Sequence, residues 1–192
     1  MRKTLPAASA CLAASAALGL LAACAGTPTV LPSNVTASYT PDIINYSAGK
    51  GGMLTEVVGN PFNAPKAELE AAVVETAEDS HFGQDIPFFT RPPEGYTSPY
   101  RVVFAMNPAP GTDFYELCGG KAETRLRAPS ESDQVAAALC ARETVITSVR
   151  GSVAGPLGPR DPAFLQLIAQ MTLALFPPDA PERRGRDGRF DL

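Results

Sequence analysis

The sequence predicts an α+β domain with a mainly antiparallel sheet of about five strands and two helices packed on one face. Short segments of alternating or continuous apolar residues have the length of strands, and turn residues between them are typical of hairpins. Two longer segments repeat apolar residues with the period of a helix. Because 19 Pro and 16 Gly occur in 192 residues, we also expect many loops.

Five segments have the composition of strands. Residues 43–48 and 53–58 flank four residues that include three glycines, which predicts a first hairpin. Residues 100–106 end at an Asn-Pro pair and predict a single strand with one face on the core. Residues 135–140 and 144–152 flank a short polar turn and predict a second hairpin.

Two segments predict helices on one face of this sheet. The first begins near Pro65, with Asn63 as its cap, and ends before Gly83. Its apolar face recurs at positions i, i+3, i+4 and i+7, namely Leu69, Ala72, Val73 and Thr76. The second spans 161–176, where an Asp-Pro pair opens it and two prolines end it. Its wide apolar face is expected to pack on the sheet.

Residues 1–23 are expected to form an export signal. Arg2 and Lys3 precede an uncharged stretch rich in Ala and Leu, which ends in Leu21-Ala22-Ala23-Cys24. This ending resembles the lipobox of bacterial lipoproteins. The resemblance implies cleavage before Cys24, lipid attached to its thiol, and a mature chain anchored to a membrane. Removing the two basic residues moves the formal charge from −4 to about −6.

The leader sets the expected organisation of the chain. Residues 1–23 form the signal peptide, 24–41 a flexible tether, 42–176 a single α+β domain and 177–192 a disordered tail. In the sorting rule of Gram-negative lipoproteins, Asp after the lipidated Cys retains a protein in the inner membrane. The residue here is Ala25, which favours the periplasmic face of the outer membrane.

Two other interpretations of the leader remain open. Ala23-Cys24-Ala25 also fits an ordinary A-x-A cleavage site, which would release a soluble periplasmic protein. An uncleaved membrane-spanning helix is the second. The stretch is weakly apolar, contains Pro6 and Gly19, and has no basic residues after it, so it fits a spanning helix less well.

Cys118 and Cys140 are the thiols left in the mature chain after Cys24, and we expect them to form a disulfide in an oxidising compartment. The alternatives are redox exchange and metal binding. Both lack the usual spacing, because the chain has no C-x-x-C motif and a single histidine, His81. We expect His81 to lie near a helix end without a catalytic role.

Arg101, Arg142 and Arg150 lie near or between predicted strands and would form an anion site if they converge. The alternative is that they are scattered over the surface. No cofactor is expected, and the acidic charge without a basic patch disfavours nucleic acid as a partner.

The sequence favours a non-enzymatic binding or assembly component of the cell envelope, with an envelope protein as a possible partner. Gly59-Asn60-Pro61-Phe62 and Phe176-Pro177 resemble segments of uncharacterised envelope lipoproteins, whose activity is unknown. The alternative is a periplasmic enzyme or small-ligand carrier that uses the aromatic loop 82–100 as a lid.

Overall fold

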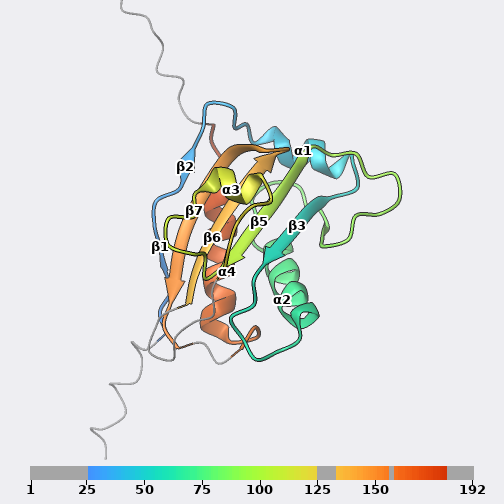
Figure 1. The fold of residues 1–192 in the computed structure, drawn as a ribbon. Helices are drawn as coiled ribbons and strands as arrows, with labels where there is room; N and C mark the ends of the chain where they lie inside the picture. Colours follow the sequence, from blue (N-terminus) through green and yellow to red (C-terminus); the bar gives the residue numbers. More distant parts are fainter. Residues whose placement is uncertain (1–25, 125–132, 156–157, 181–192) are drawn as a thin grey trace, which may run out of the picture.

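The computed structural model describes residues 26–124, 133–155 and 158–180. Within these ranges one mixed sheet of seven strands has the order β1-β7-β6-β5-β3-β4, with β2 also paired to β7 (Figure 1). The predicted α+β class is confirmed. The finer prediction is wrong, because β3 pairs in parallel with β4 and β5, and four helices accompany the sheet instead of two.

The elements follow one another with two small strands at the start of the described chain and the longest helix at its end. Their bounds are β1 (Thr29–Val30), β2 (Asn34–Val35), α1 (Asp42–Ala48), β3 (Met53–Val58), α2 (Lys66–Glu78), β4 (Phe88–Phe89), β5 (Tyr100–Met106), α3 (Phe114–Cys118), β6 (Asp133–Ala141), β7 (Thr144–Val153) and α4 (Pro162–Leu175).

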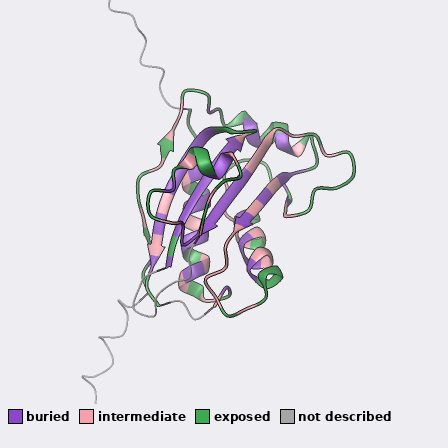
Figure 2. Cartoon of the chain, viewed as in Figure 1, coloured by how far each residue is buried: buried purple, intermediate pink, exposed green. Residues whose placement is uncertain are grey.

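The centre of the sheet is the antiparallel hairpin of β6 and β7, joined on its other side by β5. Both the hairpin and the single strand were predicted from the sequence, with ends that differ by one to two residues. Residues 135–140 of β6 are all at most 1% exposed, so this strand is covered on both faces (Figure 2). Three consecutive alanines in it, Ala136, Ala137 and Ala138, let the covering layers approach closely.

Helices α2 and α4 cover one face of the sheet (Figure 1). Helix α4 begins at Pro162 after Asp161, whose carboxylate accepts a hydrogen bond from the Ala163 amide at 2.9 Å. Its buried residues include Phe164, Leu167, Ile168, Met171 and Leu175, which join the larger core. Helix α2 starts one residue after Pro65 and has no side-chain cap, so the expected role of Asn63 is not found.

The opposite face carries a second, smaller core under α3, a helix that the sequence analysis missed. Asp113 accepts a hydrogen bond from the Glu116 amide at 2.8 Å, and the Glu116 carboxylate accepts one from the Asp113 amide at 2.9 Å. This reciprocal capping box is readable in the sequence as Asp-x-x-Glu, so the signal was available. Leu117 and Cys118 at the end of α3 are buried against the sheet.

The first predicted hairpin is wrong, because residues 42–48 form α1 instead of a strand. Ile43, Ile44 and Ser47 are buried and share one helical face. The two isoleucines are β-branched, and for this reason the sequence suggested a strand. The glycines that follow turn the chain from helix to strand. At Gly52, φ is 129° and a Cβ would lie 2.3 Å from the Pro87 carbonyl oxygen, so only glycine fits there.

Part of the segment expected to be a flexible tether is bound to the sheet. Thr29 pairs with Ser152 and Asn34 pairs with Ser148, both on β7. Tyr39 is 2% exposed and its hydroxyl donates a 2.6 Å hydrogen bond to the Pro177 carbonyl, just after α4. Burial raises the pKa of Tyr39 to about 12. The tail expected at 177–192 lies outside the described residues beyond position 180.

Gly151 tests the contact between β7 and its neighbours. A Cβ at this position would lie 2.7 Å from Leu167 Cδ1 and 3.0 Å from the Thr29 carbonyl oxygen. We expect Gly151→Ala to lower the free energy of unfolding by about 1–3 kcal/mol, because a buried methyl group must displace α4 or β1. Urea unfolding measures the loss.

Gly158→Ala is the matched control, because a Cβ there meets nothing within 4 Å. If both variants lower the free energy of unfolding by the same amount, the close packing of α4 on β7 does not explain the loss in Gly151→Ala.

Candidate functional site

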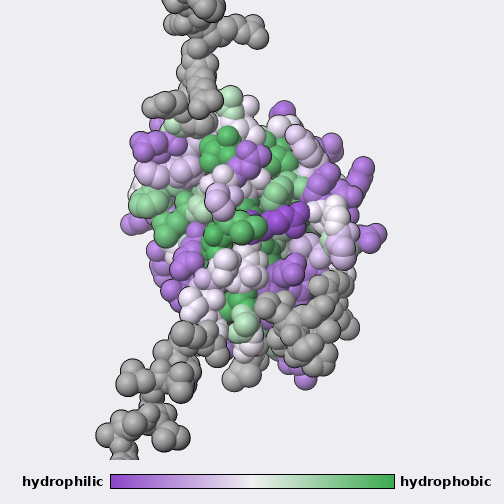
Figure 3. Space-filling view, turned by 90° about the vertical axis from the view of Figure 1, so that its left-hand side faces the viewer, coloured by the Kyte–Doolittle hydropathy of each residue, from purple (hydrophilic) through white to green (hydrophobic). Residues whose placement is uncertain are grey.

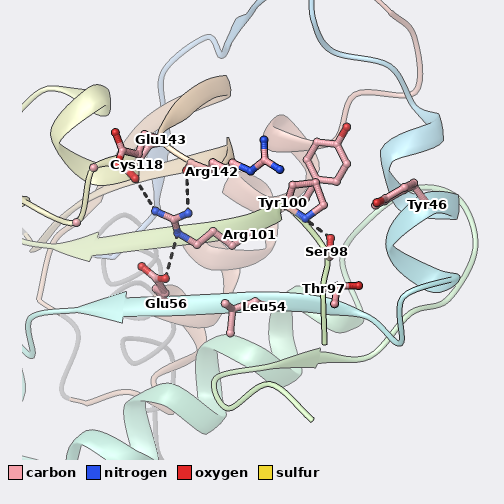
Figure 4. Close-up of a pocket in the computed structure, with 13 residues that line it drawn as sticks. Tyr46, Leu54, Glu56, Thr97, Ser98, Tyr100, Arg101, Cys118, Arg142 and Glu143 are labelled. Atoms are coloured by element: carbon pink, nitrogen blue, oxygen red, sulfur yellow. Dashed lines mark hydrogen bonds and ion pairs between the residues drawn. The ribbon is translucent and has the colours of Figure 1, made fainter. Parts of the chain in front are cut away.

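An open cavity lies where β5 begins and where the β6–β7 hairpin turns (Figure 4). We call it the distal cavity, because Gly26, the first described residue, lies near Ala154 at the other end of β7. Its volume is about 630 Å³ and its lining is mostly polar. The lining residues are Tyr46, Leu54, Glu56, Thr97, Ser98, Pro99, Tyr100, Arg101, Cys118, Gly119, Gly120, Arg142 and Glu143.

Arg101 is a structural residue of this cavity. Its Nε lies 3.0 Å from Glu56 Oε1, and its terminal nitrogens donate to the carbonyls of Arg142 and Cys118. One guanidinium thus joins β3, the tip of the β6–β7 hairpin and the end of α3 (Figure 4). The side chain is 18% exposed and its donors are directed at the protein, so it has little left to offer a ligand.

Arg142 has the opposite character. It stands in the two-residue turn between β6 and β7 with φ of 53°, and its amide donates a 2.8 Å hydrogen bond to the Pro99 carbonyl. Its guanidinium extends over the cavity toward the ring of Tyr100 (Figure 4). Among the described residues, this guanidinium has no hydrogen-bond or ion-pair partner.

Arg150 lies elsewhere. It donates a hydrogen bond to the Thr112 carbonyl and its guanidinium lies 4.8 Å from the ring centre of Phe114, so it packs under α3. Of the three arginines proposed from the sequence to form an anion site, the structure therefore brings Arg101 and Arg142 together and excludes Arg150. Of these three arginines, only Arg142 has a guanidinium at the cavity that lacks a partner among the described residues.

The expected disulfide between Cys118 and Cys140 is present, with a Cα–Cα distance of 5.6 Å. It ties the end of α3 to β6, and both residues are fully buried. Because Cys118 also lines the distal cavity and accepts a hydrogen bond from Arg101, the bridge fixes one wall of the cavity.

Two tyrosines form the opposite wall. The rings of Tyr46 on α1 and Tyr100 on β5 pack edge to face with centroids 5.5 Å apart, and Tyr46 is 45% exposed. The Lys50 Nζ lies 5.7 Å from the Tyr46 ring centre. Tyr46 and Lys50 were not predicted as site residues, because residues 43–48 were expected to form a strand away from the start of β5.

Loop 82–100, proposed as a lid, is attached to the edge of the sheet. Phe88 pairs with Met53 in β3 and is 4% exposed. The Tyr96 hydroxyl donates to the Gly52 carbonyl and accepts from the Leu54 amide, both at 3.2 Å. These contacts weigh against a lid that opens, although the end of the loop, at residues 97–100, does line the distal cavity.

His81 lies outside the distal cavity. Its ring packs against Phe88 and Phe176, with centroid distances of 5.4 and 6.3 Å. It follows the end of α2, as expected from the sequence. Within the described ranges, no three His, Cys, Asp or Glu side chains gather as metal ligands would.

The sheet edge formed by β1 and β2 is a further surface. Figure 3 shows hydrophobic side chains on this side in separate groups between hydrophilic ones. Leu31, which follows β1, is 53% exposed. In the part of the chain that is described, no helix has the length and apolar character needed to cross a bilayer. Cys24 lies outside that part.

The fold and cavity thus define an α+β domain with an open, polar cavity at one end of its sheet. No protein-family model matches the chain, and no curated protein matches it in sequence. Among solved structures it is similar to the PelC dodecamer from Paraburkholderia phytofirmans, with 13% identity and a TM-score of 0.41, covering 81% of this chain and 100% of that chain.

A methionine variant of the same dodecamer gives 17% identity and a TM-score of 0.40, covering 78% of this chain and 98% of that chain. TM-scores this low assign neither an assembly nor a ligand to this protein.

Arg101 supplies a test of how the cavity is held together. We expect Arg101→Met to lower the free energy of unfolding by about 1–3 kcal/mol, because two carbonyl groups and the Glu56 carboxylate lose their donor. Arg101→Lys should recover only part, since one ammonium group cannot reach three acceptors on separate elements. Urea unfolding of both variants measures the difference.

Arg91→Met is the control, because Arg91 is exposed and lies outside this cavity. An Arg101→Met protein with the stability of this control would show that the guanidinium does not hold the three elements together.

Proposed function

We propose that the protein is a lipoprotein of the bacterial cell envelope, anchored through Cys24 at the periplasmic face of the outer membrane. We further propose that its domain is a non-enzymatic binding or assembly component that presents the distal cavity to its partner. The observation that carries the proposal is that Gly26, two positions after Cys24, lies at the end of the domain opposite the distal cavity.

The link between anchor and domain is short. One residue, Ala25, separates Cys24 from Gly26, and the two peptide units between their Cα atoms span at most about 7 Å. A Cβ at Gly26 would lie 3.5 Å from Ala163 Cβ, at the start of α4, so a lipid on Cys24 would hold this end of the domain close to the membrane. Strand β7 has ten residues, which places its other end about 30 Å farther away. The distal cavity would therefore face away from the membrane.

Two further features support export and anchoring. The Leu21-Ala22-Ala23-Cys24 sequence resembles a lipobox and follows a basic and then an uncharged stretch. The buried Cys118–Cys140 disulfide is the kind of bond that persists in an oxidising compartment such as the periplasm. The alternative, a periplasmic enzyme or small-ligand carrier with loop 82–100 as its lid, has less support because that loop is attached to β3.

Lipidation is tested by the intact mass of the protein extracted from membranes. We expect a mass equal to the chain from Cys24 onward plus a diacylglycerol group and acyl chain, and we expect Cys24→Ser to abolish this form and its retention in the outer-membrane fraction. Cys11→Ser is the matched control, because it lies within the leader and should leave the mass unchanged. An unmodified N-terminus at Ala25 or later would contradict the anchor.

The binding role is tested by photo-crosslinking in intact cells. A photoreactive residue in place of Tyr46 should capture an envelope component, because Tyr46 is exposed at the distal cavity. The same residue in place of Tyr115, which is 71% exposed on α3, is the control and should capture less. Equal capture at both positions, or none at Tyr46, would contradict a binding role for the cavity.

A further inference from the structure

We propose that the distal cavity binds a small organic anion, whose carboxylate or phosphate group is held by Arg142 and whose body packs against Tyr46 and Tyr100. The inference rests on the proposed function only in treating the cavity as a binding surface. It does not depend on the lipid anchor.

The first argument is that Arg142 is available. The guanidinium of the neighbouring Arg101 contacts the Glu56 carboxylate and two carbonyl groups. The guanidinium of Arg142 has no such partner among the described residues. A guanidinium offers five N–H donors in a planar fork, and two of them match the two oxygens of a carboxylate or phosphate. Arg142 thus presents this fork at the cavity without having to break an existing contact.

The second argument concerns the backbone at this position. A φ of 53° is unfavourable for arginine and is adopted readily by Gly or Asn. The hydrogen bond from the Arg142 amide to the Pro99 carbonyl stabilises this conformation. The hairpin turn therefore has an arginine in a strained backbone conformation, although Gly or Asn would adopt this conformation with less strain. Backbone strain of this kind is common at functional sites.

The third argument is the distribution of charge. The cavity is lined by two acids, but Glu56 is paired with Arg101, and Glu143 lies on the side of Cys118, away from the Arg142 guanidinium (Figure 4). On the side of the tyrosines, Lys50 does not itself line the cavity but adds positive charge nearby, since its Nζ lies 5.7 Å from the Tyr46 ring centre. An anion that enters between Arg142 and the tyrosines meets positive charge and no facing carboxylate among the lining residues.

The tyrosines define the rest of the ligand. Tyr46 and Tyr100 pack edge to face, and 45% of the Tyr46 surface is exposed. This leaves a large part of an aromatic ring in contact with solvent. A flat apolar body placed there covers this area while its charged group reaches Arg142. An aromatic carboxylate satisfies both requirements, and acetate satisfies only one.

The experiment uses the full chain purified from membranes in detergent, with NMR of the arginine Nε–Hε and tyrosine ring signals at constant ionic strength. The probes are sodium benzoate, sodium acetate and inorganic phosphate, each compared with chloride. We expect benzoate to bind more tightly than acetate, and Arg142→Gln to weaken its binding about ten-fold, because a charge-assisted pair of hydrogen bonds is lost. Arg91→Gln is the matched control and should bind as the unaltered chain does.

Arg142→Gly separates binding from folding, because glycine accepts the backbone conformation of the turn. We expect it to lose benzoate binding with a Tm equal to or above that of the unaltered chain. Phosphate binding that exceeds benzoate binding and depends on Arg142 would identify phosphate as the preferred group of the anion class. Unchanged binding in Arg142→Gln, or no binding of any probe, would overturn the proposal, whereas capture at Tyr46 in cells would still support the proposed function.

Discussion

Strand β6 is buried on both faces, and the positions of the other elements depend on this constraint. One face is covered by the long apolar surface of α4, and the other by α3, whose five residues are too few for a helix that is stable by itself. The Cys118–Cys140 disulfide ties this short helix to β6. Since the end of α3 is then fixed, Arg101 can bond to its last carbonyl and to the hairpin tip together, and the cavity acquires rigid walls.

The sequence predicted those elements whose pattern matched their environment. Helix α4 and the β6–β7 hairpin carry long apolar periods between clear turn signals, so tertiary context had little to override. The prediction of a strand was wrong for residues 42–48, because these seven residues include two β-branched side chains and form too few helical turns for a helical period to appear. The parallel pairing of β3 could not be predicted either, because strand order depends on contacts between segments far apart in the sequence.

The candidate site was partly predictable because some of its residues lie on elements that the sequence pattern predicts. Arg101 and Arg142 lie on elements that were placed correctly, and the pairing of Arg101 with Cys140 brings them to one end of the sheet. No sequence signal distinguished Arg101, whose terminal nitrogens are bonded to the protein, from Arg142, whose guanidinium has no partner among the described residues, because the difference arises from the carbonyl groups that surround Arg101. Tyr46 enters the site only through the fold of α1.

The outer strands of the sheet have a consequence for association. At one edge, β1 and β2 have two residues each and are separated by a segment that contains Pro32. At the other edge, β4 also has two residues and follows Pro87. Proline offers no N–H to a neighbouring strand, and two-residue strands give an incoming chain almost nothing to pair with. These short outer strands therefore hinder growth of the sheet at the residues they cover, which are Ser152, Gly151, Ser148 and Thr147 of β7 and Met53 and Leu54 of β3.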